Sequence, residues 1–189
     1  MRYAILAILL MFLAGLSRGD QSDPNAGQKA AQQAIIELSE NLDAPDLPER
    51  AARIVGEHES ENISSVFVNT RRGGMGAGPL GMNPPYGDSV ELFVRRLVAR
   101  PLTAAEVDKN KAEMLKIARV IRAMSELAPY RVPVNAKPAV KKEWAQVAAE
   151  FHDTATGLHD AVEKSDPAAI RAAARKLNNT CCHCHSLLD

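Results

Sequence analysis

Aromatic residues are scarce in this 189-residue chain, at 4% of the total, and neither sign of charge dominates. Few aromatics together with many alanines favour a helical fold over a β-sandwich. The 23 basic and 23 acidic residues cancel, so the basic excess typical of nucleic-acid-binding proteins is missing. The sequence also lacks a P-loop, a dinucleotide-binding fingerprint and a nucleophile–base arrangement. We therefore do not expect an enzyme.

The longest apolar run lies at the start of the chain, and it is too short for an ordinary transmembrane helix. Arg2 precedes the run, which covers residues 4–16, and the small residues Ser17 and Gly19 follow it. This order is typical of a secretory signal peptide, whereas a membrane span needs about 20 apolar residues. Cleavage of residues 1–19 removes two arginines and no acid, which leaves 170 residues with a net charge of −2. We predict an exported, periplasmic protein, with an uncleaved membrane anchor as the alternative.

Residues 20–87 form a predicted N-terminal extension that is rich in turn-forming residues. Within it, residues 25–42 and 48–57 have the spacing and start signals of short helices. The apolar face of the first of these carries Ala31, Ile35 and Leu38. Residues 71–88 contain six glycines and three prolines, a composition that excludes regular structure and predicts a loop. The extension is therefore expected to be only partly helical.

Residues 88–189 have a sustained helical periodicity. Start signals for four helices occur at Asp88 or Ser89, at Thr103 with Glu106, at Lys137-Pro138 and at Asp166-Pro167. The last helix has an apolar face formed by Ile170, Ala174, Leu177, Cys181 and Cys184. One short and three long amphipathic helices with short connections can bury their apolar faces by bundling. The predicted fold is all-α: a four-helix bundle preceded by the extension and its Gly/Pro-rich loop.

All three cysteines lie near the end of the chain, in the segment TCCHCH over residues 180–185. Cys181, Cys184 and His185 form C-x-x-C-H, the haem-attachment pattern of c-type cytochromes. Two thiols bond the two vinyl groups of one porphyrin, and the histidine offers an imidazole nitrogen to the iron. On a helix, Cys181 and His185 are four residues apart and face the same way. We therefore predict haem c, bound covalently through Cys181 and Cys184, with His185 as the iron ligand.

Two other uses of these cysteines stay open. A structural zinc site usually draws ligand pairs from separated segments, and the remaining histidines of the mature chain outside the motif region, His58, His152 and His159, are scattered. A disulfide or a redox dithiol is expected of exported cysteines, although three is an odd number. Cys182 is the spare thiol, and it points about 100° away from Cys181 on a helix. We expect no catalytic role for Cys182.

Residues 88–189 resemble the class II c-type cytochromes, which include cytochrome c′ and cytochrome c-556. The likeness rests on the C-x-x-C-H motif at the extreme C-terminus and on the helical pair LHDAVEKSDPAAIRAAARKLNNTCCHCH. The resemblance implies a four-helix bundle in which the two motif cysteines hold haem and the motif histidine is the axial ligand. These roles correspond to Cys181, Cys184 and His185. The chain departs from the family where it ends in SLLD, because an aromatic and a basic residue commonly follow the motif.

The sixth iron ligand is not fixed by the resemblance. Low-spin members of the family supply a methionine from the first helix, but residues 88–99 contain none. Met75 and Met82, in the glycine-rich loop, are candidates, and an open sixth position is the third possibility. Met114 and Met124 lie within a predicted long helix, where filling the core is the better interpretation.

Four further residues are candidates for contact with the haem. Trp144 and Phe151 share one face of the third bundle helix, and they are expected to fill the core or pack on the ring. Arg175 and Lys176 precede the motif and either pair with the haem propionates or lie on the surface as solvated charges.

The predicted function is electron transfer by an exported monohaem cytochrome, with redox proteins as partners. The alternative is a five-coordinate haem protein that binds NO or CO in sensing or scavenging. A weaker hypothesis is that the extension docks the haem domain onto a larger redox complex. The resemblance also implies a possible homodimer through the first two helices, although the first of these is short.

Overall fold

The protein is described by a computed structural model that covers residues 25–77 and 88–187. Throughout these residues the secondary structure is helical, with no strand, which confirms the all-α prediction. None of the helices in the two described ranges combines the length and the apolar character needed to cross a membrane. The predicted signal peptide, over residues 1–19, and Met82 lie outside the described residues.

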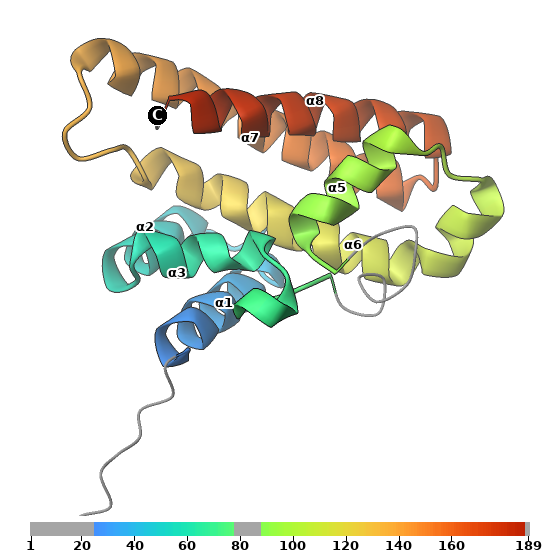
Figure 1. Ribbon diagram of the computed structural model, residues 1–189, viewed down its shortest axis with the longest axis horizontal. Helices are drawn as coiled ribbons and strands as arrows, with labels where there is room; N and C mark the ends of the chain where they lie inside the picture. The colour runs from blue at the N-terminus through green and yellow to red at the C-terminus, as the bar shows by residue number, and fades with distance from the viewer. Residues whose placement is uncertain (1–24, 78–87, 188–189) are drawn as a thin grey trace, which may run out of the picture.

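Four helices form the bundle in the C-terminal half of the chain (Figure 1). They are α5 (Val90–Ala99), α6 (Ala104–Leu127), α7 (Pro138–Glu163) and α8 (Pro167–Ser186). Helices α7 and α8 lie side by side along their length, α6 packs on α7, and the short α5 packs against α8. Their shared core contains the fully buried side chains of Phe93, Met114, Ile121, Leu158, Ile170 and Leu177. The predicted bundle of one short and three long helices is therefore observed.

The bundle helices begin where the capping signals predicted. The Ser89 hydroxyl accepts a hydrogen bond from the Leu92 amide at 3.1 Å, and the Asp166 carboxylate accepts from two amides of α8 at 2.9 and 3.0 Å. At the start of α6, the Glu106 amide donates to the Thr103 hydroxyl at 3.2 Å and the Thr103 amide donates to the Glu106 carboxylate at 2.8 Å. Each cap satisfies backbone donors that have no partner inside the helix.

The capping box makes one contribution to stability depend on pH. The hydrogen bond from the Thr103 amide, with help from the Arg100 guanidinium at 2.6 Å, lowers the pKa of Glu106 from 4.5 to about 2. Because the folded-state pKa is the lower one, the ionised carboxylate stabilises the fold above pH 4.5, and this contribution is lost as pH falls through about 2. In urea titrations, Glu106→Gln should lower the free energy of unfolding above pH 4.5, and the gap from wild type should close near pH 2.

Glu113→Gln is the matched control for this prediction, because Glu113 lies on the same helix and pairs with Lys116 at 3.0 Å on the surface. Exposed ion pairs of this kind contribute little, so its effect should be smaller. Equal effects of the two substitutions, or a gap for Glu106→Gln that does not change with pH, would contradict the prediction.

The N-terminal extension is more helical than predicted. Its elements are α1 (Ala26–Ser39), α2 (Leu47–Glu57), α3 (Ser60–Ser64) and two 3-10 turns, η1 (Ser65–Phe67) and η2 (Thr70–Arg72). The sequence predicted α1 and α2, but it missed α3 and η1. It was also wrong to exclude regular structure from residue 71 onward, since η2 includes Arg71 and Arg72 and is capped by the Asn69 side chain.

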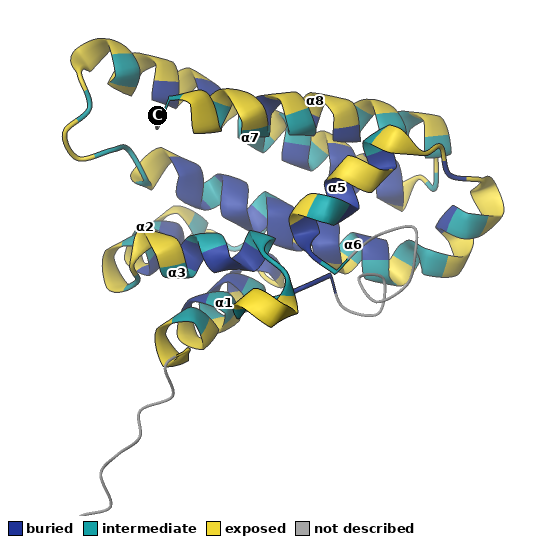
Figure 2. Ribbon diagram, in the orientation of Figure 1, coloured by how far each residue is buried: buried dark blue, intermediate teal, exposed yellow. Residues whose placement is uncertain are grey.

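The extension packs on α6 through a second apolar core. Ala31, Ile35 and Leu38 of α1, all fully buried, meet Met124 and Leu127 of α6. Figure 1 shows α1, α2 and α3 together against the side of α6 that faces away from α7 and α8, and Figure 2 shows α6 buried along much of its length. Helix α6 therefore separates two cores, one shared with the bundle and one shared with the extension.

Candidate functional site

The C-x-x-C-H motif occupies the last turn and a half of α8, and its two outer cysteines lie on the inward side of the helix. Ile170, Ala174 and Leu177 are buried along this face. Cys181 and Cys184 continue it and are half-buried, whereas Cys182 is exposed. All three cysteines are free thiols. The burial pattern follows from the helical period, since positions 181 and 184 share a face that position 182 does not.

Burial sets the ionisation of the two inward thiols. It raises the pKa of Cys181 from 9.0 to about 11, with smaller contributions from the neighbouring cysteines. Burial also raises the pKa of Cys184, while the positive charge of Arg131 acts in the opposite direction. Both groups are therefore protonated thiols at neutral pH, the form in which sulfur is least easily oxidised.

The two histidines near the end of α8, His183 and His185, are exposed. His185 is exposed, one helical turn beyond Cys181. The neighbouring His183 has a ring nitrogen, Nε2, that lies 3.2 Å from the Glu143 carboxylate of α7. Among the described residues, His183 is the one of these two histidines with such a carboxylate contact, and His185 occupies the position predicted for the iron ligand.

Arg131 brings a positive charge to the motif, and sequence reasoning missed it. It follows the 3-10 turn η3 (Ala128–Tyr130), and its guanidinium donates to the Ser60 carbonyl at 3.1 Å, the Ser60 hydroxyl at 2.6 Å and the Ser64 hydroxyl at 2.9 Å. Its Nε atom is buried and has no hydrogen-bond partner. Burial lowers the pKa of Arg131. A half-buried cation that acts on Cys184 and whose Nε–H has no partner is suited to an anionic oxygen.

Three apolar side chains from distant parts of the chain lie where the two cores meet. Phe67, Met75 and Phe151 are each half-buried, and each packs against both apolar clusters. Cys181 packs against the first of these clusters, so this thiol adjoins an apolar region. Trp144 is buried and donates its indole N–H to the Ala128 carbonyl at 2.9 Å, which fixes the end of α6 against α7. Trp144 therefore fills the core, which was one of the two roles expected for it.

The structure places Arg175 and Lys176 on the surface. Both are exposed, and Arg175 lines a groove of about 370 Å³ together with Arg171 and Pro101. Arg175 precedes Cys184 by nine residues, which is about 13 Å along a helix. Their exposure agrees with the alternative in which both residues are solvated surface charges.

The other histidine and methionine side chains considered as metal ligands contact other parts of the protein. His152 lies 3.1 Å from the Glu126 carboxylate, which links α7 to α6. Met114 and Met124 are 0% and 2% exposed, so the prediction that they fill the core is confirmed. Met75, by contrast, lies at the junction of the two cores.

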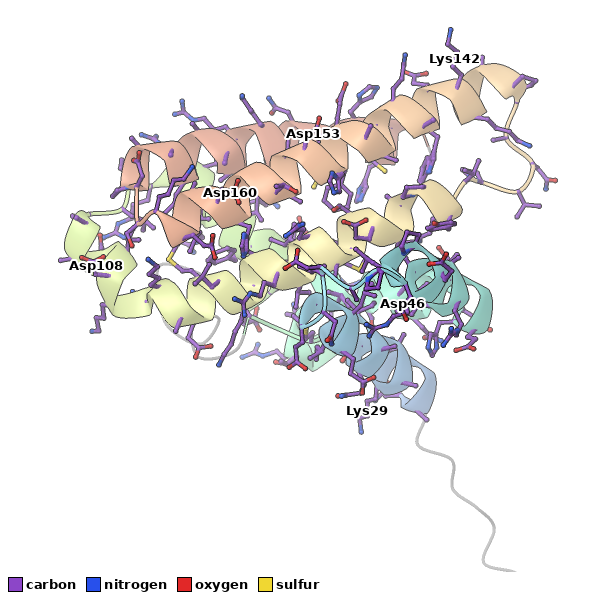
Figure 3. The ribbon with its side chains drawn as sticks, turned by 180° about the vertical axis from the view of Figure 1, so that it is seen from behind. Lys29, Asp46, Asp108, Lys142, Asp153 and Asp160 are labelled. Atoms are coloured by element: carbon purple, nitrogen blue, oxygen red, sulfur yellow. The ribbon has the colours of Figure 1, made fainter. Side chains whose placement is uncertain are left out.

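A zinc site at the cysteines finds no support among the described residues. The one group of three potential metal ligands there comprises His159, Asp160 and Glu163, and it includes no cysteine. This group lies near the end of α7, as the position of Asp160 in Figure 3 shows, whereas Lys142 marks the other end. His183 contacts Glu143, next to Lys142, so the motif meets α7 at the end remote from that group.

The donor set fits the haem that the C-x-x-C-H motif predicts. Two free thiols share the inward face of α8, an imidazole follows one turn after the first of them, and apolar side chains adjoin Cys181. The buried Nε of Arg131, which has no partner, matches the carboxylates that a haem carries. The described residues therefore include two thiols, an imidazole, an apolar contact and a positive charge that would suit such a group.

Comparison with known proteins gives one match. A protein-family model described as Cytochrome C′ matches residues 98–187. The match begins within α5 and takes in α6, α7 and α8 almost to the end of the chain. Neither the curated proteins nor the solved structures contain a match. The extension and most of α5 lie outside the matched residues.

Proposed function

Because residues 98–187 belong to the cytochrome c′ family, we propose that this protein is an exported, monohaem c-type cytochrome that carries electrons between redox proteins. The family implies covalently bound haem c with iron, and its members generally bind haem without being enzymes. The observation that carries the proposal is the pair of free, half-buried thiols on one face of α8, with His185 one turn beyond the first.

Within this proposal, Cys181 and Cys184 hold the haem through thioether bonds and His185 binds the iron. Each thiol adds across one vinyl group, so the sulfur gains a bond to carbon and its proton passes to the other vinyl carbon. The burial that keeps both thiols protonated keeps them reduced until attachment. Cys182 is exposed and faces away from this pair, so it takes no part.

The surrounding residues orient and tune the group. Arg131 offers its buried Nε to a haem carboxylate while its Nη2 stays on Ser60 and Ser64 of α3. Phe67 and Phe151 exclude water from the apolar side of the site. When bound, the haem supplies an iron that gains one electron in passing from ferric to ferrous and releases it on return. Burial and the Arg131 charge then influence the reduction potential.

Export supports the same proposal. The layout of residues 1–19 is that of a secretory signal, and haem attachment to C-x-x-C-H motifs takes place on the exported side of a membrane. We infer a periplasmic location, where redox proteins are available as electron donors and acceptors.

The test is expression of the full chain in a host with a periplasmic haem-attachment pathway. We expect a coloured protein whose pigment resists acidified acetone, whose mass includes one haem, and whose reduced form passes its electron rapidly to a second c-type cytochrome. Colourless protein, or pigment lost to the solvent, would disprove covalent attachment. Pigmented protein that exchanges electrons slowly and takes up CO or NO readily would instead support the gas-binding alternative.

A further inference from the structure

A buried histidine near the end of α7 lies between two carboxylates. The His159 side chain is 10% exposed, and its Nδ1 atom lies 3.5 Å from an oxygen of Asp160. Its other ring nitrogen, Nε2, lies 4.0 Å from an oxygen of Glu163, four residues further along the helix. Both distances exceed the roughly 2.7–3.2 Å of an ordinary N–H···O hydrogen bond. Buried polar side chains are normally hydrogen-bonded, so these two contacts leave the imidazole only weakly satisfied.

The three side chains can direct one ligand atom each toward a common point. One ring nitrogen of His159 and one oxygen each from Asp160 and Glu163 all lie within 4.8 Å of one another. Ligand atoms around a tetrahedral zinc ion are about 3.4 Å apart, since each bond is about 2.1 Å long. The 3.5 Å between His159 Nδ1 and Asp160 is close to this separation. The Glu163 side chain is 53% exposed, so it is free to rotate and complete the set.

The charge at this end of α7 favours a cation. Asp160 and Glu163 lie in the last turn, where the helix dipole is already negative, and this turn contains no basic residue. The Lys111 ammonium of α6 donates to the Glu163 backbone carbonyl at 2.5 Å, which is a bond to the main chain and not to a carboxylate. Lys164, the C-cap residue, is exposed. A divalent ion between the side chains would offset both carboxylates and the end of the helix.

We propose that His159, Asp160 and Glu163 bind one divalent transition-metal ion of the Zn²⁺ type, at the end of α7 remote from the C-x-x-C-H motif. The donor set decides the class of ion. An imidazole with two carboxylates suits Zn²⁺, whereas Ca²⁺ and Mg²⁺ take oxygen ligands and Cu⁺ selects sulfur. Three protein ligands leave a fourth position for water. Because the unfolded chain does not hold these ligands together, binding stabilises the fold.

The test measures Zn²⁺ binding to the full, pigmented protein by equilibrium dialysis. All variants carry Cys182→Ser, so that this exposed thiol does not bind the probe. We expect one Zn²⁺ per chain that a large excess of Mg²⁺ does not displace. His159→Gln and Glu163→Gln should each weaken binding by more than about tenfold, because even the loss of a hydrogen-bond partner behind a metal ligand costs about 10–100-fold. Glu163 is exposed, so its variant decides the result if replacement of the buried histidine unfolds the chain.

His152→Gln is the matched control, because His152 also lies on α7 between two carboxylates. Its ring nitrogens are 3.1 Å from Glu126 and 3.8 Å from Asp153. In the described parts of the chain, however, the ligand atoms of these three residues do not converge as those around His159 do. We therefore expect unchanged Zn²⁺ affinity in His152→Gln. Zn²⁺ should also raise the thermal unfolding midpoint of the Cys182→Ser protein and of His152→Gln, but not that of Glu163→Gln.

Four results would overturn the inference. They are a Cys182→Ser protein that binds no Zn²⁺, ready displacement of the ion by Mg²⁺, unchanged affinity in Glu163→Gln, and equal weakening in His152→Gln. The last would mean that any histidine beside carboxylates binds the ion. None of these results concerns the thiols of α8, so the inference and the proposed function fail or succeed separately. Far-UV circular dichroism on each variant checks that the helices are intact.

Discussion

Replacing both Cys181 and Cys184 by serine should abolish all pigment that resists acidified acetone. Serine preserves the size and polarity of the side chain but does not form the thioether bonds to the vinyl groups. Each single substitution should leave one bond and a shifted absorption maximum, since one vinyl group stays unreacted. The measurement is the absorbance left on the protein after acid–acetone extraction, together with the mass of the intact chain.

Cys182→Ser is the matched control, because it removes a thiol one residue away from Cys181. Cys182 is exposed, while Cys181 and Cys184 are half-buried on the inward face of α8. We expect the control to retain its full pigment with an unchanged spectrum. Equal loss of pigment in Cys182→Ser, or acid-stable pigment in the double variant, would show that the attachment groups are assigned wrongly.

Replacing Ile35 by alanine should destabilise the whole described structure by about 2–5 kcal/mol, the usual cost of emptying a buried isoleucine position. Ile35 is 0% exposed and lies in the core shared by α1 and α6. Because α6 also contributes to the bundle core, the extension and the bundle should unfold in one transition. Urea unfolding followed by circular dichroism and by haem absorbance should give coincident curves that are shifted together.

Ile36→Ala is the matched control on the next position of the same helix. Ile36 is only half-buried and does not belong to either apolar cluster. The two substitutions share the same change in helix propensity, so the difference between their effects isolates the buried contact. Two separate transitions would mean that the extension is a separate unit, and equal destabilisation by both substitutions would mean that the buried Ile35 contact adds nothing specific.

The helices and the motif were accessible to sequence reasoning because they depend on local chemistry. The capping signals at Ser89, Thr103 and Asp166 satisfy backbone donors within three residues of themselves. The inward face of α8 follows from a period of 3.6 residues, and the same period separates Cys181 and Cys184 from Cys182. A second apolar stripe on α6, with Met124 and Leu127, was also readable and would have predicted a partner on each side of that helix.

The sequence by itself determined the all-helical class and the helix starts, and it predicted the haem-attachment groups, since each follows from spacings of three to five residues. Tertiary structure alone decided which distant groups come together. Arg131 meets Ser60 across 71 residues, and Met75 joins the cluster that Cys181 borders, although no regular spacing relates these positions. Such contacts depend on how the packed extension closes against α6, a global outcome of burying two apolar cores at once.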